Sequence, residues 1–270
     1  MFLLNEKKIK KSLKTDIIGK ELFFLETVDS TNRYARKLIK NGFGEGVVII
    51  ADKQTKGRGR FGRKWYSPSG MGVWMSIILS PINSEDLIVV TNYICALSIV
   101  EAIYDLILLK GEIKWPNDIL ISKKKVGGIL SEFVKIEREK GFIIAGLGIN
   151  INQDYEDFPI DLQEIATSLN IECGCKLSRE EVIVSVLRFL EKNYLSAKSK
   201  GVDFIFKKWI SWCTTIGKKI RVITSEKYFE GIAETIKPEG KLIIRGKEGK
   251  MKEITPSDII QVIEYKNFHK

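Results

Sequence analysis

The stretch K-Q-T-K-G-R-G-R-F-G-R-K-W, residues 53–65, decides how the rest of the sequence is interpreted. Six of its thirteen residues are basic, none is acidic and three are glycines. An apolar run at residues 47–50 precedes it and an alternating apolar segment at residues 72–79 follows it, which predicts a strand on each side. We therefore expect residues 53–65, called the cationic loop below, to connect two strands.

The composition of the cationic loop is typical of a site for an anion. Glycines let a backbone approach a ligand closely, and arginine guanidinium groups fit phosphate or carboxylate oxygens in pairs. Because like charges repel, we expect the loop to be mobile when empty and ordered by an anion. A solvated basic loop on a basic protein is the alternative. The position between strands and the aromatic Trp65 at its end favour a nucleotide site.

Composition places the chain among globular proteins, since 44% of its 270 residues are hydrophobic and 29% are charged. No run of about 20 apolar residues is present, so no membrane span is expected. The start of the chain is rich in lysine and lacks the apolar core of a signal peptide, which favours the cytoplasm. The net charge of +10 permits nucleic-acid binding but does not indicate it, because acidic and basic residues are interspersed.

Cysteine and histidine usage argues against several kinds of chemistry. The four cysteines contain no C-x-x-C pair, and Cys173 and Cys175 flank a single glycine, which is too close for an ordinary structural disulfide and too few ligands for zinc. The one histidine, His269, is next to the C-terminal residue, which argues against Ser-His-Asp or Cys-His catalysis. Any chemistry then has to use lysine, arginine, carboxylates, amides or a bound metal.

Helix and strand signals alternate in the first 213 residues. Ser30 caps a helix that runs towards Leu38, and residues 84–86 open a long helix. The expected buried stripe of that long helix is Leu87, Val90, Ile94, Leu97, Val100, Tyr104 and Ile107. Strands are predicted at 112–115, 119–122, 128–135 and 142–152, and their short connections imply antiparallel pairing. A capping box at residues 178–181 starts a helix that buries Ile183, Leu187, Leu190 and Tyr194, and another helix covers residues 202–212.

These elements predict an α+β fold, with a mixed, mainly antiparallel sheet covered by helices on one face. Five short strands are expected in the C-terminal part, at residues 220–223, 228–236, 241–245, 251–254 and 259–263. They indicate a small barrel in which nothing looks catalytic. We divide the chain into a short basic arm (1–19), a main domain (20–215) and a small C-terminal domain (216–270).

Three further motifs follow the cationic loop. K-W-P-N-D at residues 114–118 presents a lysine, an amide and a carboxylate from a proline turn, a set that suits phosphate, ribose or base, and metal. K-x-G-G at residues 125–128 and G-x-G-I-N at residues 146–150 place glycines where a flat group could lie against the backbone. Each motif alone is weak, whereas their order along one chain is more specific.

Together with S-T-N at residues 30–32 and the cationic loop, these motifs resemble those of the biotin protein ligases, also called biotin–[acetyl-CoA-carboxylase] ligases. The resemblance extends from residue 20 to the end of the chain. It implies a catalytic domain like that of class II synthetases and an SH3-like C-terminal barrel. It also implies that biotin and MgATP form biotinyl-5′-AMP, from which biotin passes to a lysine of a biotin carboxyl carrier protein.

The resemblance also implies roles for individual residues. Those that match biotin-binding positions are Ser30, Thr31, Asn32, Gln54, Arg58, Gly59, Arg60, Lys125 and Gly127. Those that match ATP or adenylate positions are Arg60, Arg63, Trp65, Lys114, Asn117, Asp118 and Asn150. Lys114 and Arg60 are the candidate catalytic residues, and Asp118 is the candidate ligand of Mg²⁺. Trp65 could cover the adenine by stacking.

Several alternatives stay open at this point. The competing interpretations are a lipoate or octanoate ligase of the same fold, a nucleic-acid-binding module, and a biotin sensor without catalysis. The arginine-rich loop favours biotin over lipoate. We expect no DNA binding, because the 19 residues before the main domain leave no room for a winged helix. Exposed sheet edges favour a homodimer.

Overall fold

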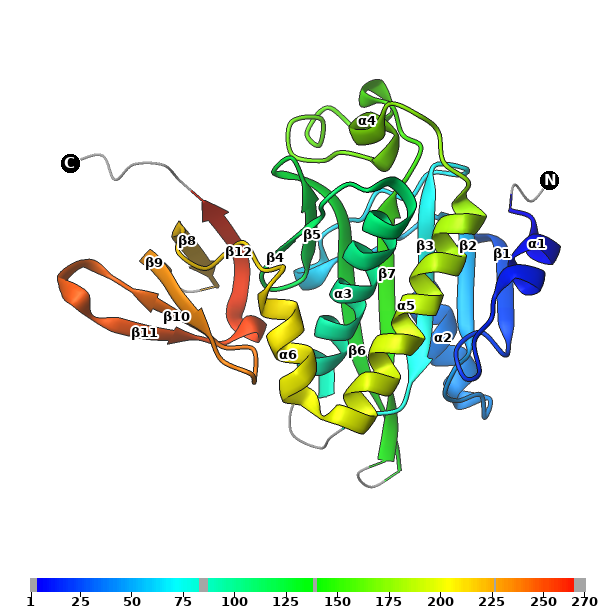
Figure 1. The fold of residues 1–270 in the computed structure, drawn as a ribbon, viewed down its shortest axis with the longest axis horizontal. Coiled ribbons are helices and arrows are strands. Elements are labelled where there is room, and N and C mark those ends of the chain that lie inside the picture. The colour runs from blue at the N-terminus through cyan, green and yellow to red at the C-terminus, as the bar shows by residue number, and fades with distance from the viewer. Residues whose placement is uncertain (1–3, 83–86, 138–139, 226, 265–270) are drawn as a thin grey trace.

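The computed structural model describes residues 4–82, 87–137, 140–225 and 227–264 (Figure 1). Its larger sheet has seven strands in the spatial order β1-β2-β3-β7-β6-β5-β4. They are β1 (Leu22–Val28), β2 (Val48–Gln54), β3 (Gly72–Leu79), β4 (Glu112–Lys114), β5 (Asp118–Ile121), β6 (Lys124–Glu137) and β7 (Lys140–Asn150). Strands β1 and β2 pair in parallel, and every other neighbouring pair of this sheet is antiparallel. The predicted mixed, mainly antiparallel sheet is confirmed.

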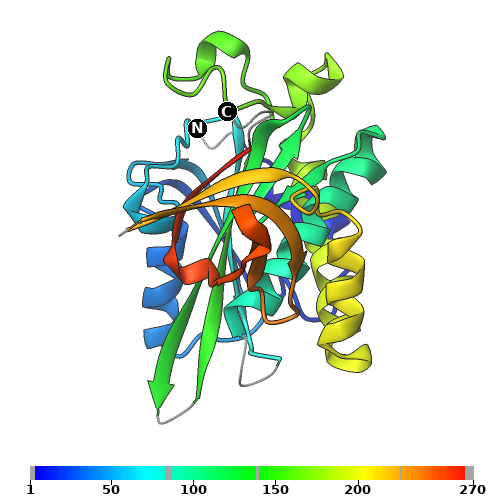
Figure 2. The same cartoon turned by 90° about the vertical axis from the view of Figure 1, so that its left-hand side faces the viewer.

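Helices cover both faces of this sheet, whereas we expected them on one face. The helices concerned are α2 (Thr31–Lys40), α3 (Leu87–Ile107), α5 (Arg179–Lys200) and α6 (Val202–Ile210). Helices α3 and α5 pack on one face with α6 beside them, and α2 packs on the other (Figures 1 and 2). Ile49 of β2 lies in the cluster under α2, whereas its neighbour Ile50 lies in the main core. Adjacent residues of one strand are thus buried on opposite faces, as expected of a sheet covered on both sides.

Helix α3 is buried on more sides than its predicted stripe indicates. Val90, Ile94, Leu97 and Val100 are buried as expected. Tyr104, also in the predicted stripe, is 50% exposed, and Tyr93 instead packs against Trp209 of α6 with ring centroids 4.6 Å apart. The predicted start at residues 84–86 lies outside the described residues. The segment Ile88–Ile107 is apolar and long enough to cross a membrane, but 67% of it is buried inside the fold, as in a core helix.

The N-terminal segment is packed against the body of the protein. Helix α1 (Glu6–Ser12) lies against α5, and Ile9 and Ile18 are fully buried. The Glu191 carboxylate accepts hydrogen bonds from three successive backbone N–H groups of residues 16–18 at 2.7–2.8 Å. Leu4, Ile9 and Ile18 are the sequence features that the expectation of a basic arm overlooked.

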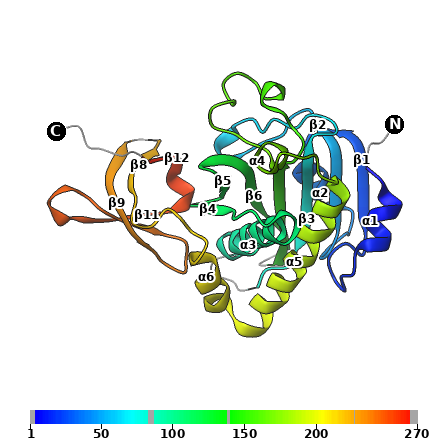
Figure 3. The ribbon, with the colours of Figure 1, turned by 45° about the horizontal axis from the view of Figure 1, so that its top comes forward.

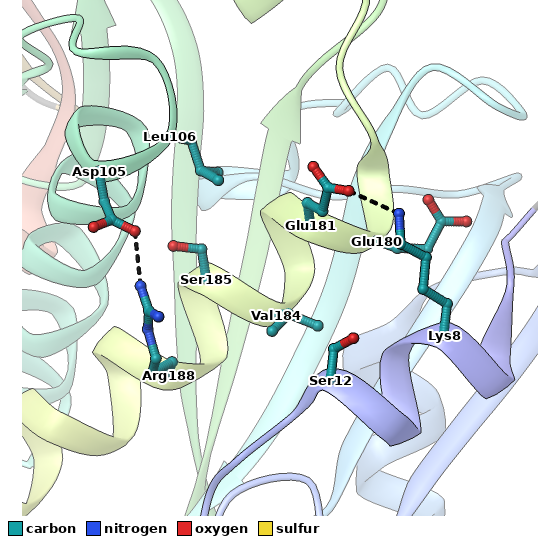
Figure 4. A pocket seen from close by; sticks show the side chains of 9 residues that line it. All are labelled: Lys8, Ser12, Asp105, Leu106, Glu180, Glu181, Val184, Ser185 and Arg188. Atoms are coloured by element: carbon teal, nitrogen blue, oxygen red, sulfur yellow. Dashed lines mark hydrogen bonds and ion pairs between the residues drawn. The ribbon is translucent and has the colours of Figure 1, made fainter.

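A shallow groove of about 200 Å³ lies between α1, α3 and α5 (Figure 4). Lys8 is paired there with Glu181, with Nζ and Oε1 2.8 Å apart, and Arg188 is paired with Asp105 at 2.7 Å. Both cations of this groove are thus neutralised by carboxylates.

The smaller sheet has five antiparallel strands in the order β11-β10-β9-β8-β12 (Figure 3). They are β8 (Lys219–Thr224), β9 (Tyr228–Ile236), β10 (Leu242–Arg245), β11 (Met251–Ile254) and β12 (Ile259–Glu264), close to the predicted ranges. Trp115, just after β4, donates its indole N–H to the carbonyl of Gly240 at 2.9 Å. This hydrogen bond, made by a buried side chain, fixes the smaller sheet against the β4 edge of the larger one.

Candidate active site

A cavity of about 490 Å³ lies where the two sheets meet, a size typical of small-molecule sites. Its walls are formed by the cationic loop, the start of α2, the strands around β6 and β7, residues 158–166 and β12. Every residue that the sequence predicts for biotin, ATP or metal binding lines it, with the exception of Gly127. Gly127 is buried inside β6, where a Cβ atom would lie 3.2 Å from the carbonyl oxygen of Gly148. We therefore assign Gly127 to strand packing.

One end of the cavity holds a set of hydroxyls and amides, called the polar cluster below: buried Ser30, Thr31, Asn32 and Ser76, and half-buried Gln54. Thr31 donates to Gln54 Oε1 from its backbone N–H at 2.9 Å and from its hydroxyl at 3.2 Å. Ser30 precedes α2, but its hydroxyl makes no capping hydrogen bond. The polar cluster thus presents donors and acceptors from the start of a helix.

Ser76 is a member of the polar cluster that the sequence did not reveal. It lies in β3, fully buried, with its hydroxyl 2.6 Å from Asn32 Oδ1 and 2.7 Å from Thr31 Oγ1. The amide nitrogen of Asn32 donates to Leu130 O at 3.1 Å and to Glu132 Oε2 at 2.9 Å. Both ends of the Asn32 amide are therefore occupied, which indicates that this residue positions its neighbours. The only sequence signal for Ser76 is a hydroxyl in an otherwise apolar strand.

Glycines form the floor of the cavity. A Cβ atom at Gly146 would overlap Asn32 Oδ1, and one at Gly148 would overlap the indole of Trp65. A Cβ atom at Gly128 would lie 3.2 Å from the same indole. The flat group that lies on Gly128 and Gly148 is thus the indole of Trp65. Its indole N–H is buried and has no protein partner among the described residues, so it is available to a ligand.

The cationic loop folds back on itself. The Gly59 N–H donates to Arg63 O at 2.7 Å, and the Trp65 N–H donates to Gly57 O at 3.0 Å. Phe61 at the tip has a φ of 53° and a side chain that is 53% exposed. The predicted loop between two strands is confirmed. Its ordering by an anion stays a prediction.

Arg60 connects the cationic loop to the smaller sheet. Its guanidinium donates to the carbonyl of Pro256, to Ile259 O at 3.5 Å and to Asn117 Oδ1 at 3.4 Å. Burial lowers the pKa of Arg60, and the nearby Asp118 carboxylate opposes that shift. We expected nothing catalytic in the C-terminal strands, and the structure adds that Ile259, Ile260, Gln261 and Val262 line the cavity. Arg60 meets backbone carbonyls there, and three of the four lining residues are apolar, so the contact leaves no motif in the sequence.

The remaining cations differ in how far they are neutralised. Lys125 Nζ lies 2.5 Å from Asp118 Oδ1, and Arg58 Nη2 lies 3.9 Å from Glu132 Oε1 while its buried Nε has no partner among the described residues. Lys114 and Arg63 make no side-chain ion pair or hydrogen bond within the described part of the chain. The cavity therefore contains cations that can bind an incoming anion.

Asn117 and Asn150 make structural hydrogen bonds at the cavity wall. The Asn117 amide donates to Ile129 O at 2.7 Å, and the Asn150 amide donates to Thr167 O at 3.0 Å. Asn150 thereby connects the end of β7 to the segment before α4 (Leu169–Cys173). Residues of that segment, including Phe158 and Leu162, close the cavity on a side that the sequence did not predict.

Comparison with known proteins agrees with this architecture. Residues 24–150 match the model of the Biotin/lipoate A/B protein ligase family, and residues 215–260 match that of the Biotin protein ligase C terminal domain. The bifunctional ligase/repressor BirA of Bacillus subtilis (strain 168) is 40% identical over 95% of this chain and 78% of its own length. The biotin–[acetyl-CoA-carboxylase] ligase of Mycobacterium tuberculosis is 27% identical over 87% of this chain and 89% of its own length.

Among solved structures, biotin protein ligase from Aquifex aeolicus in complex with biotin and ATP superposes with a TM-score of 0.79. It is 31% identical and covers 91% of this chain and 100% of its own. Sequence, both domain models and fold thus agree, and the chain belongs to the biotin protein ligase family.

Proposed function

We propose that this chain joins biotin to ATP as biotinyl-5′-AMP and then transfers biotin to a specific lysine of a biotin carboxyl carrier protein. The observation that carries the proposal is one cavity that combines the polar cluster with Lys114 and Arg63, cations without a counter-ion among the described residues. We place the reaction in the cytoplasm. A homodimer formed through an exposed sheet edge stays a prediction.

The polar cluster suits the ureido ring of biotin. That ring carries two N–H donors and one carbonyl acceptor on a rigid frame, and each needs a partner when it leaves water. Ser30 has a hydroxyl free of capping, and Gln54 has an amide already oriented by Thr31 and Ser67. Such fixed groups discriminate against analogues that lack the matching polar atoms.

The first step brings two anions together, because a carboxylate oxygen of biotin attacks the α-phosphorus of ATP and pyrophosphate leaves. Lys114 and Arg63 line the cavity and have no neutralising partner in the part of the chain that the structure describes, so their charge is available to the reacting groups. A charged donor aimed at developing negative charge contributes about 3–4 kcal/mol, or 10²–10³ in rate. In the second step the amine of the acceptor lysine attacks the acyl carbon, and AMP leaves.

Magnesium fits this cavity as part of the nucleotide substrate. No group of three histidine, cysteine or carboxylate side chains gathers in the described ranges. Asp118, the candidate ligand, is paired with Lys125. Mg²⁺ keeps several waters and is commonly bound through substrate phosphates with one or two carboxylates. Asp118 would then be the carboxylate that meets an ion arriving on the triphosphate.

The experiment that tests the proposal is exchange of labelled pyrophosphate into ATP. We expect exchange that depends on biotin and is absent with lipoate or octanoate at the same concentration. If lipoate alone supported exchange, the chain would be a lipoate ligase, the other activity that the name of the matched family model includes. A second assay supplies a carrier domain and measures biotin on its lysine, which decides the acceptor.

A further inference from the structure

Two thiols lie side by side at the end of α4. Cys173 and Cys175 flank Gly174, and their sulfur atoms are 3.4 Å apart. Cys173 is half-buried and Cys175 is exposed, so both can be reached by a small reagent. Gly174 has a φ of 73°, and a Cβ atom built on it would meet nothing within 4 Å. Neither the family assignment nor the proposed reaction uses this pair.

The geometry allows the two sulfurs to become bonded. A disulfide has an S–S distance of about 2.05 Å, so the sulfurs would have to approach by about 1.4 Å. The glycine between them makes such an adjustment accessible, since its backbone is the least restricted of any residue. Exposed and strained disulfides are readily reduced, which suits a reversible bond in a reducing compartment.

The thiol pair is connected to the cavity through Glu172. The Glu172 carboxylate accepts hydrogen bonds from Thr167 Oγ1 at 2.6 Å and from Ser122 Oγ at 2.7 Å. The backbone of Thr167 in turn accepts from the Asn150 amide at 3.0 Å and donates to Lys125 O at 2.9 Å. Two residues, Glu172 and Thr167, thus separate Cys173 from Asn150 and Lys125, both of which line the cavity.

We propose that Cys173 and Cys175 are a dithiol modification site that closes to an intramolecular disulfide by exchange with a small-molecule disulfide, and that closure weakens nucleotide binding. One protein thiolate attacks the reagent and releases one thiol, and the second protein thiolate then displaces the other. Two protein thiols and one disulfide become one protein disulfide and two small thiols. The effect on nucleotide binding rests on the proposed function, whereas formation of the disulfide does not.

The hydrogen bond between the two thiols affects the rate of this exchange. It raises the pKa of Cys175 and so disfavours the attacking thiolate at neutral pH. Exchange should therefore accelerate as pH rises towards that raised pKa. The geometry of the pair, and not the pKa, determines whether the ring closes.

The first experiment incubates the full chain with glutathione disulfide and follows intact mass and alkylatable thiols. We expect the parent protein to lose two hydrogen atoms and two thiols without retaining glutathione. Cys173→Ser and Cys175→Ser should each retain one glutathione, and the control Cys213→Ser should behave as the parent does. Glutathione retained on both cysteines of the parent, or a disulfide between two chains, would overturn the proposal.

The second experiment measures the dissociation constant of ATP by calorimetry for reduced and oxidised protein. We expect weakening on the order of fivefold, reversed by dithiothreitol and absent in the double variant Cys173→Ser/Cys175→Ser. Equal affinities would refute the coupling. If neither form bound ATP, the proposed function and the coupling would fall together, while the mass measurement would still decide the disulfide.

Discussion

Arg60 of the cationic loop donates a hydrogen bond to the backbone carbonyl of Pro256, in the turn between β11 and β12. A second carbonyl, that of Ile259, lies 3.5 Å from the same nitrogen. The loop that carries most of the local positive charge is therefore attached to the smaller sheet and not only to the strands on either side of it. Four residues of β12 complete the wall behind this contact.

Replacing Arg60 by glycine should release the loop from the smaller sheet. We expect biotinyl-5′-AMP to form but to escape into solution, because a closed loop excludes water and retains reactive intermediates. Rapid filtration of enzyme loaded with labelled biotin and ATP measures retention. Arg33→Ala removes an exposed arginine from α2 and is the matched control. Retention equal to that of the parent would show that the contact with Pro256 does not close the site.

Replacing Lys114 by alanine should slow adenylate formation by about 10²–10³-fold while leaving the dissociation constant of biotin close to that of the parent. The reason is that its charge meets the phosphate and not the ureido ring. Single-turnover kinetics at saturating biotin and ATP, together with calorimetry of biotin alone, separate the two effects. A parent-like rate under saturation would remove Lys114 from the reaction.

Replacing Gly146 by alanine should weaken biotin binding through the polar cluster. The added methyl group overlaps Asn32 Oδ1, and overpacking of this kind costs about 1–3 kcal/mol, or roughly tenfold or more in Kd. Calorimetry gives the affinity, and circular dichroism establishes that the variant is folded. Gly246→Ala, where the nearest atom would lie at an ordinary 3.5 Å, is the control. Undiminished affinity would mean that Asn32 does not position biotin-binding groups.

Two arginine replacements should show that a buried ion pair contributes more to the free energy of unfolding than an exposed one. Arg179 lies 2.7 Å from Asp52 with side chains 6% and 3% exposed, so Arg179→Ala should lower the free energy of unfolding by about 3–5 kcal/mol. The control Arg188→Ala breaks a pair with Asp105 whose side chains are 53% and 46% exposed, and should cost about 1 kcal/mol or less. Urea denaturation measures both, and similar losses would contradict the assignment of Asp52 as a buried charge.

The elements that the sequence predicted well are those specified by local patterns. Alternation of apolar residues located β3, and the sequence 30–32 located the start of α2. The cationic loop was recognisable because six basic residues and three glycines lie between two apolar runs. These features depend on neighbours in the chain, which a single sequence displays directly.

The elements that the sequence did not predict depend on contacts between distant segments. Ser76 belongs to the site because the fold places β3 beneath α2, a contact between segments that are distant in the sequence. The role of β12 depends on carbonyl groups that every residue possesses, and Tyr104 is exposed because α3 turns that position away from its neighbours. At the N-terminus, the many lysines led us to expect a basic arm and to overlook Ile9, which is buried.

The wall contributed by β12 has a consequence for biosynthesis. The N-terminal part of a chain leaves the ribosome first, so the larger sheet can pair and bury its core while β12 is still inside the ribosome. Until Ile259–Glu264 emerges, the growing polypeptide has a pocket open on one side, and Arg60 lacks the carbonyl of Ile259 as an acceptor. Catalytic competence is thus acquired only after β12 has been synthesised, and nascent chains that stop short of this strand should be folded but inactive.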